Sequence, residues 1–167
     1  MTTSAPWVDG LTIGQVLTRT AQRVGSRDAL VFPQAQCRAT WAEFDQAVDR
    51  VARGLLALGF QRGEHFGVWS TNWPEWVILQ FATARIGVVL VTINPAYRAS
   101  ELEFALAQSE VRGLALIEEF RSSRYFEMLE QVCPEVKSSA PGQLSSDRFP
   151  RLKWVIRLRG SEHRGLL

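Results

Sequence analysis

The chain has 167 residues, of which 46% are hydrophobic and 22% charged, and it contains two cysteines. This composition is that of an ordinary globular protein with enough apolar residues for a core, and it excludes collagen, wholly disordered chains and disulfide scaffolds. Nineteen basic against seventeen acidic residues leave a formal net charge of +2, which by itself indicates no nucleic-acid partner.

The sequence shows neither a membrane span nor a targeting signal. Its longest apolar stretches, residues 76–84 and 86–93, are shorter than the ~18 residues that a transmembrane helix needs. Residues 1–11 lack the basic start and the apolar run of a secretory signal, so we expect a flexible start over this segment. A cytoplasmic location is therefore expected.

Helix starts are marked by a side-chain oxygen followed three residues later by Glu or Gln, a spacing that satisfies free backbone N–H groups. Four helices are marked in this way, and a fifth helix without such a start is expected over about 123–133, where Pro134 stops it. The helix over about 41–58 is the clearest, because apolar residues recur along it at steps of three and four. The four marked starts are Thr12 with Gln15, Thr40 with Glu43, Asn72 with Glu75, and Ser100 with Glu103.

Short apolar segments between these helices predict strands. Because strands that alternate with helices are typical of βαβ units, the predicted fold class is α/β, with a layered, mostly parallel sheet flanked by helices. The run VVLVTI is apolar on both alternations, so we expect a strand that is covered on both faces. Residues 37–40 are expected to pair with the first strand as a hairpin at the edge of the sheet. The predicted strands are 29–32, 65–70, 88–93, 113–117 and 152–158.

The same pattern divides the chain into parts. We expect an α/β core over residues 12–136 and an exposed connection over 137–150, a segment rich in Ser, Pro and Gly. A last strand and a tail are expected over 151–167. Within the core, the helix over about 73–86 is apolar nearly all round and is expected to pack on more than one side.

Motifs for nucleotide, metal or nucleophilic chemistry are absent from the sequence. It contains no GxGxxG and no GxxxxGK followed by Ser or Thr. His65 and His163 have no cluster of other ligand types around them, so no metal site and no catalytic residue is predicted. Cys37 and Cys133 lie far apart in the sequence, and both are expected to be buried thiols.

Two loops follow predicted parallel strands on the carboxyl side of the sheet, where open α/β sheets generally bind ligands. They are residues 69–72 and 94–97. Asn72 is interpreted as a helix cap, and Trp73 and Trp76 as packing residues rather than contacts of an acyl chain.

The ordered series over residues 40–106 resembles the front of the acyl-adenylate-forming (AMP-binding) enzymes, which include acyl-CoA synthetases, adenylation domains and luciferases. Within that family the segments INPAYRASELEFAL and RYFEMLEQVCPEV are most similar to fatty acyl-CoA ligases of medium-chain type. The resemblance covers about residues 12–158. It implies an incomplete amino-terminal subdomain of the acyl-adenylate-forming fold.

The resemblance also implies a reaction and its cofactors. The family activates a fatty acid with ATP and Mg²⁺ to an acyl-adenylate and then transfers the acyl group to CoA. Its phosphate loop, its metal-coordinating acid and its catalytic lysine belong to segments downstream of the last strand seen here. We therefore expect the 167-residue chain to be inactive alone and to bind none of these cofactors strongly.

One fragment of the family's CoA site is implied in this chain. Related acetyl-CoA synthetases place two arginines, three residues apart, where they contact the 3′-phosphate of CoA, and Arg121 and Arg124 match this spacing. Guanidinium groups suit phosphate oxygens, and residues at i and i+3 share a helix face near the expected helix start. The alternative is two solvated arginines on a surface turn.

Three interpretations of function stay open at this point. The leading one is an amino-terminal fragment of an acyl-CoA synthetase, with a fatty acid and CoA as the family's substrates. The second is a non-catalytic α/β binding or regulatory module that acts through a partner chain, with possible self-association through an apolar sheet edge over 152–158. The third, that the basic residues over 148–164 bind anionic lipid or nucleic acid, is disfavoured because that segment has the alternation of an ordinary strand.

Overall fold

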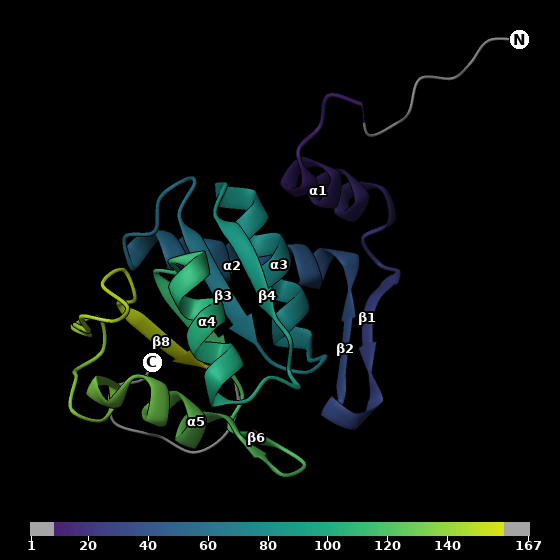
Figure 1. Ribbon diagram of the computed structural model, residues 1–167. Coiled ribbons are helices and arrows are strands. Elements are labelled where there is room, and N and C mark those ends of the chain that lie inside the picture. Colours follow the sequence, from purple (N-terminus) through teal and green to yellow (C-terminus); the bar gives the residue numbers. More distant parts are fainter. Residues whose placement is uncertain (1–8, 159–167) are drawn as a thin grey trace, which may run out of the picture.

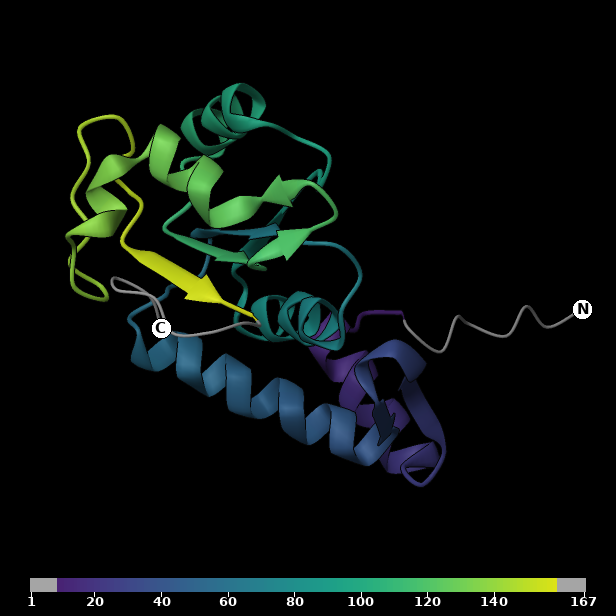
Figure 2. The same ribbon diagram turned by 90° about the horizontal axis from the view of Figure 1, so that it is seen from below.

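The computed structural model describes residues 9–158, which form two layers of helices around a parallel sheet (Figures 1 and 2). Two short 3₁₀ helices, η1 (Pro33–Ala35) and η2 (Pro134–Lys137), accompany the longer elements. The helices are α1 (Ile13–Val24), α2 (Trp41–Ala57), α3 (Pro74–Ile86), α4 (Ala99–Ser109) and α5 (Tyr125–Val132). The strands are β1 (Asp28–Phe32), β2 (Cys37–Thr40), β3 (His65–Trp69), β4 (Val89–Ile93), β5 (Gly113–Leu116), β6 (Glu119–Phe120), β7 (Ser123–Arg124) and β8 (Trp154–Arg157).

The central sheet has four parallel strands in the order β4-β3-β5-β8. Phe66 of β3 stands opposite Leu90 of β4 and Gly113 of β5, and Gly113 stands opposite Trp154 of β8. Figure 2 shows α2 (blue) on one side of this sheet and α5 (green) on the other. The predicted α/β class with a mostly parallel, helix-flanked sheet is therefore confirmed.

Alternate side chains of each strand enter two different cores, as the period of two in a pleated strand requires. Leu114 and Leu116 of β5 pack with α4 and α5, whereas Ala115 packs with α2 and α3. On β8, Val155 joins the first core and Ile156 packs against the second. Both faces of the sheet are therefore dry where these helices cover it.

The helix starts follow the sequence in two cases of four. The predicted capping boxes at Thr12 and Thr40 are confirmed, because each side chain accepts a hydrogen bond from the backbone N–H three residues on, at 3.2 and 3.3 Å. The prediction at Asn72 is wrong: Trp73 precedes α3 without a side-chain cap, and Pro74, whose fixed φ suits a first helical turn, begins the helix. The prediction at Ser100 is wrong by two residues, since Arg98 precedes α4 and its N–H donates to Glu101 Oε2 at 2.7 Å.

The hairpin of β1 and β2 is antiparallel, as expected, but it forms a separate two-stranded sheet and does not extend the parallel one. It packs with α1 against α2 and α3, in a third cluster that includes Leu17, Leu30 and Phe44 (Figure 1). The position expected at the edge of the parallel sheet is therefore wrong. That edge belongs to β4 instead, and Val89 there is 46% exposed, so the expectation of a strand covered on both faces is corrected as well.

The segment over 137–150 contains no strand, but it is not simply exposed. Leu144, Ser146 and Phe149 are buried, and Ser146 Oγ donates to Glu135 Oε1 at 3.0 Å. At Gly142, where φ is +76°, an added Cβ would lie 2.3 Å from the Trp154 ring. The connection is therefore packed against β8 and η2. Its few apolar side chains, spaced through a polar segment, face the core.

Arg112 joins three strands at the amino end of the sheet. Its N–H donates to the His65 carbonyl at 2.9 Å, and its carbonyl accepts from Lys153 and Trp154 at 2.9 and 3.2 Å. Its guanidinium donates to both carboxylate oxygens of Glu64, at 2.7 and 2.9 Å. Partial burial acts to raise the pKa of Glu64, but the hydrogen bonds from Arg112 and Gln61 outweigh it and hold the pKa below its usual value.

This pair should make the stability of the chain sensitive to acid. Because the pKa of Glu64 is lowered in the folded state, its contribution is present above its usual pKa of 4.5 and is lost as pH falls through the folded value. We expect Glu64→Gln to lower the free energy of unfolding by about 1 kcal/mol at pH 7 and by less at pH ~3.5, measured by urea titration with tryptophan fluorescence. Asp147→Asn, at an exposed carboxylate, is the control, and a Glu64→Gln effect of equal size at both pH values would contradict a stabilising role for the ionised Glu64 carboxylate.

Candidate functional site

Three segments meet at the carboxyl end of the sheet. Residues 70–72 directly follow Trp69, the last residue of β3; residues 94–97 follow β4, and the β6–β7 hairpin follows β5. Trp69 Nε1 donates to the Asn94 carbonyl at 3.1 Å, so the first two segments lie side by side. The expectation that these loops gather at one edge of a parallel sheet is confirmed.

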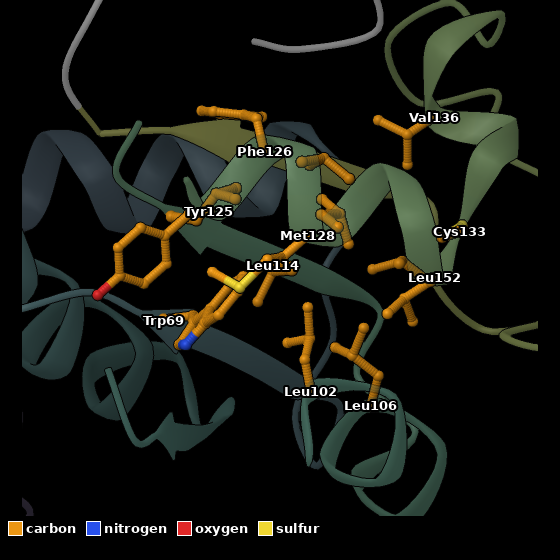
Figure 3. Close-up of a cluster of buried hydrophobic side chains, with 14 of the residues drawn as sticks. Trp69, Leu102, Leu106, Leu114, Tyr125, Phe126, Met128, Cys133, Val136 and Leu152 are labelled. Atoms are coloured by element: carbon orange, nitrogen blue, oxygen red, sulfur yellow. The ribbon is translucent and has the colours of Figure 1, made fainter. Parts of the chain in front are cut away.

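Two aromatic side chains hold this edge together. The rings of Trp69 and Tyr125 are completely buried and meet edge to face, with centroids 4.4 Å apart (Figure 3). The Tyr125 hydroxyl donates to the Pro95 carbonyl at 2.9 Å, which ties the start of α5 to the loop after β4. Burial raises the pKa of Tyr125, so its hydroxyl stays protonated as the donor that this contact needs.

A hollow of about 310 Å³ opens between the loop after β4 and the β6–β7 hairpin. Its polar groups are two guanidinium groups and two hydroxyls. The lining residues are Pro95, Ala96, Arg98, Phe120, Arg121, Ser122 and Ser123.

Arg121 lies in the two-residue turn of the hairpin, which is closed by the pairs Glu119 with Arg124 and Phe120 with Ser123. Its backbone has a φ of +55°, a conformation that side-chain-bearing residues rarely adopt, and its guanidinium lies 5.1 Å from the centre of the Phe120 ring. No carboxylate within residues 9–158 forms an ion pair with it. This guanidinium therefore keeps its hydrogen-bonding capacity for a group in the hollow.

Arg124 is placed differently. It forms an ion pair with Glu119 across the hairpin and does not line the hollow. The expectation that Arg121 and Arg124 share a helix face is wrong, because α5 begins at Tyr125 and both arginines belong to the hairpin. Residues 119–124 form a short antiparallel hairpin, so the i, i+3 spacing does not place the two arginines on one helix face.

The second cation of the hollow is Arg98, which the sequence reasoning missed. Its NH1 donates to Ser123 Oγ at 3.2 Å, and no carboxylate of the described residues forms an ion pair with it. A signal was present in the sequence, since Arg98 directly follows a loop at the carboxyl end of a predicted strand. Arg98 and Arg121 together offer fork-shaped donors, a combination that suits a phosphate or another oxyanion.

Among the described residues, no group of three or more His, Cys, Asp or Glu side chains is placed so that it could hold a metal ion. The ring of His65 forms a hydrogen bond with the Ser109 carbonyl, so its role is structural; His163 lies outside the described residues.

Trp73 and Trp76 are both partly buried against the hydrophobic cores, which agrees with their interpretation as packing residues. Asn94 shapes its own loop, since its side-chain oxygen accepts from the Ala96 N–H at 2.9 Å.

Between residues 9 and 158, no helix has the length and apolar character that crossing a membrane requires.

Comparison with known proteins adds to this geometry. The family described as AMP-binding enzyme matches residues 17–159. Medium-chain acyl-CoA ligase ACSF2 of Danio rerio is 45% identical over 145 residues, which cover 87% of this chain and 24% of that protein. YngI of Bacillus subtilis is 41% identical over 157 residues, which cover 91% of this chain and 29% of that protein.

Solved structures agree on the fold. A fatty acyl CoA synthetase of Mycobacterium tuberculosis has a TM-score of 0.71 at 23% sequence identity, over 87% of this chain and 26% of that one. The chain spans about a quarter of the length of the proteins that it matches.

The two cysteines differ in environment. Cys133 is completely buried, and burial, followed by a hydrogen bond with Glu135, raises the pKa of its thiol to about 11. Cys37 in β2 is half-buried, so the expectation that both thiols are buried is wrong for this one. The hairpin that carries Cys37 stands apart from the central sheet and leaves it partly open to solvent.

This difference predicts selective alkylation. At pH 8, a pKa of about 11 leaves roughly a thousandth of the Cys133 thiol as thiolate, in addition to its steric protection. We expect iodoacetamide to modify Cys37 in the folded chain and Cys133 only after unfolding, as followed by peptide mass spectrometry. Cys37→Ser should abolish labelling of the folded chain and Cys133→Ser should leave it unchanged; prompt labelling at Cys133 would contradict the buried placement.

Proposed function

Since the chain belongs to the AMP-binding enzyme family, we propose that it is the amino-terminal part of an acyl-CoA ligase that acts on fatty acids. In this family a fatty acid is activated with ATP to an acyl-adenylate, and the acyl group then passes to CoA. The observation that carries the proposal is the 45% identity to a medium-chain acyl-CoA ligase over 87% of this chain. The medium-chain preference itself is part of the proposal.

We propose further that the chain does not catalyse this reaction alone. Transfer at an α-phosphate needs cations and aligned donors around the developing charge. Both lysines of the chain are engaged elsewhere: Lys137 pairs with Glu130 at 3.2 Å, and Lys153 Nζ donates to the Leu144 carbonyl at 3.1 Å. The part of the chain that the structure describes also lacks a phosphate-cradling glycine loop, and the match spans about a quarter of the relatives' length.

The test is an assay for pyrophosphate with ATP, Mg²⁺ and octanoate. We expect no release above that of a blank for the purified 167-residue chain, whereas the fatty acyl CoA synthetase of M. tuberculosis serves as the positive control. Pyrophosphate formation that stays proportional to the amount of this chain through a second purification step would overturn the proposal of inactivity. It would leave the family assignment untouched.

The resemblance implies Arg121 and Arg124 as residues of the CoA site, and the geometry adds Arg98 to them. We propose that the hollow receives the 3′-phosphate of CoA, with Arg121 and Arg98 as the direct donors. Arg124 contributes after release from Glu119, its ion-pair partner in the hairpin. The support is two guanidinium groups in one hollow, neither of which is held by a carboxylate of the described residues. Because the site is open to solvent, binding to this chain alone is expected to be weak.

Substitution of these arginines tests the phosphate site. CoA should perturb the amide resonances of residues 95–98 and 120–124 in ¹⁵N spectra with millimolar affinity, and dephospho-CoA should do so more weakly. We expect Arg121→Gln and Arg98→Gln each to raise the Kd for CoA about threefold, as for exposed ion pairs, and Arg124→Gln to raise it less. Arg53→Gln on α2 is the control, and equal affinity of the Arg121→Gln variant and the unaltered chain would exclude the site.

A second candidate function is a non-catalytic module that acts through a partner chain. The observation that favours it is the position of β8 as an outer strand of the described sheet, where a further chain has access. Self-association through the same edge is proposed for the chain when no partner is present. A cytoplasmic location likewise stays a prediction from the sequence.

A further inference from the structure

The β6–β7 hairpin places serine hydroxyls beside the guanidinium groups of the hollow. Ser122 and Ser123 line the hollow together with Arg98 and Arg121. Ser123 is in direct contact with a cation, because Arg98 NH1 donates to its Oγ at 3.2 Å. A group attached to the Ser123 oxygen is therefore within reach of the cationic donors of the hollow.

The charges around this oxygen favour an anion. The residues that line the hollow include no Asp and no Glu. Two carboxylates nearby in the fold are engaged: Glu119 forms an ion pair with Arg124, and Glu101 accepts from the backbone N–H of Arg98 at 2.7 Å. The guanidinium groups that line the hollow form no ion pair with a carboxylate of the described residues, so they remain available to a negatively charged group.

A phosphate on Ser123 would be the same chemical group as the 3′-phosphate of CoA. Both are phosphomonoesters, with three terminal oxygens and a charge of about −1.5 to −2 at neutral pH. Fork-shaped guanidinium donors suit either of them. Because the phosphate on Ser123 is held covalently beside these donors, its effective concentration there favours it over CoA from solution.

The hairpin is also accessible to a modifying enzyme. Figure 1 shows the hairpin of β6 (green) projecting from the body of the fold. Ser123 is half-buried, in a ladder of only two residue pairs, and so short a ladder opens locally at little cost in free energy. Arg121 two residues before it and Arg124 one residue after it give the basic flanks that an arginine-directed serine kinase recognises by complementary charge.

We propose that Ser123 is a phosphorylation site and that its phosphate occupies the hollow in place of the 3′-phosphate of CoA. The γ-phosphoryl group of a nucleoside triphosphate passes to Ser123 Oγ in the active site of a serine kinase. The bond between the γ-phosphorus and the β,γ-bridging oxygen breaks, a bond from phosphorus to the serine oxygen forms, and the hydroxyl proton passes to a base of the kinase. A nucleoside diphosphate is the other product.

The modification would control the CoA site. Arg98 and Arg121 donate to the phosphate on Ser123, and CoA then finds no free donors for its own phosphate. This inference rests on the proposed CoA site and deepens it by assigning its regulation.

Phosphoserine introduced at position 123 of the 167-residue chain during translation tests the docked phosphate without a kinase. In ³¹P spectra, we expect the second pKa of this phosphoserine to lie below the ordinary value of about 6, because two guanidinium groups favour the dianion. Arg98→Gln should raise that pKa again. The matched control is phosphoserine at position 145, an exposed serine of the connection, whose pKa should be ordinary and indifferent to Arg98→Gln.

CoA titrations followed by amide resonances test the competition. Phosphoserine at position 123 should raise the Kd for CoA about tenfold, since both arginines of the hollow are occupied and each is expected to contribute about threefold. The modified chain should also bind CoA no better than dephospho-CoA. Phosphoserine at position 145 should leave the Kd unchanged.

Incubation with ATP and a panel of arginine-directed serine kinases tests the transfer itself. Peptide mass spectrometry should find phosphate on Ser123. Ser123→Ala should abolish this product, Arg121→Gln should reduce it, and Ser145→Ala should leave it unchanged. Circular dichroism confirms that each variant is folded.

Three results would overturn the proposal: an ordinary second pKa for phosphoserine at position 123, no kinase of the panel that modifies Ser123, or equal CoA affinity with and without the phosphate. The first two readouts need no CoA, so they decide the modification even if the unmodified chain fails to bind CoA. An ordinary pKa together with CoA binding that depends on Arg98 and Arg121 would reject the modification and keep the CoA site.

Discussion

The contact between Trp69 and Tyr125 is the constraint on which the carboxyl edge of this fold depends. Trp69 ends a central strand and Tyr125 begins α5, and each donates a hydrogen bond to the loop after β4, at Asn94 and Pro95. Two large aromatic rings can be buried completely here because their polar atoms reach backbone carbonyls. The β6–β7 hairpin, which directly precedes Tyr125, is thereby held beside that loop, and the hollow opens between them.

Arginine serves two purposes in this structure. Arg85 joins α3 to α2 and α1 through Asp45 and Thr18, and Arg112 joins three strands and pairs with Glu64. These groups are partly buried and matched by carboxylates, so they stabilise the packing of elements. Arg98, Arg121 and Arg157 lack a carboxylate partner among the described residues and lie at the borders of the fold. The guanidinium groups of Arg98 and Arg121 line the hollow at the carboxyl edge, where we propose that an oxyanion binds.

Much of the fold could be predicted because helices and strands have different periods and the chain alternates between them. The stripe along α2, the strand segments and the stop at Pro134 are local properties, and the structure bears them out. Two helix starts were misplaced. The helix expected after Asn72 begins at Pro74, whose fixed φ suits a first helical turn, and the helix expected after Ser100 begins after Arg98, whose N–H donates to Glu101. For the site, the sequence indicated Arg121, but Arg98 is far from it in the chain and joins it through the fold alone.

The sequence by itself determined the class of the fold, the existence and order of most elements, and a resemblance that the comparisons confirm as family membership. These follow from local periodicity and from a long ordered match. Tertiary structure decided that β1 and β2 form a separate hairpin, that β4 lies at an edge, and which arginines are paired. The first two points could not be predicted because a central strand and an edge strand can have the same run of apolar residues. The partner of a guanidinium could not be predicted because it comes from segments that meet only when the chain is folded.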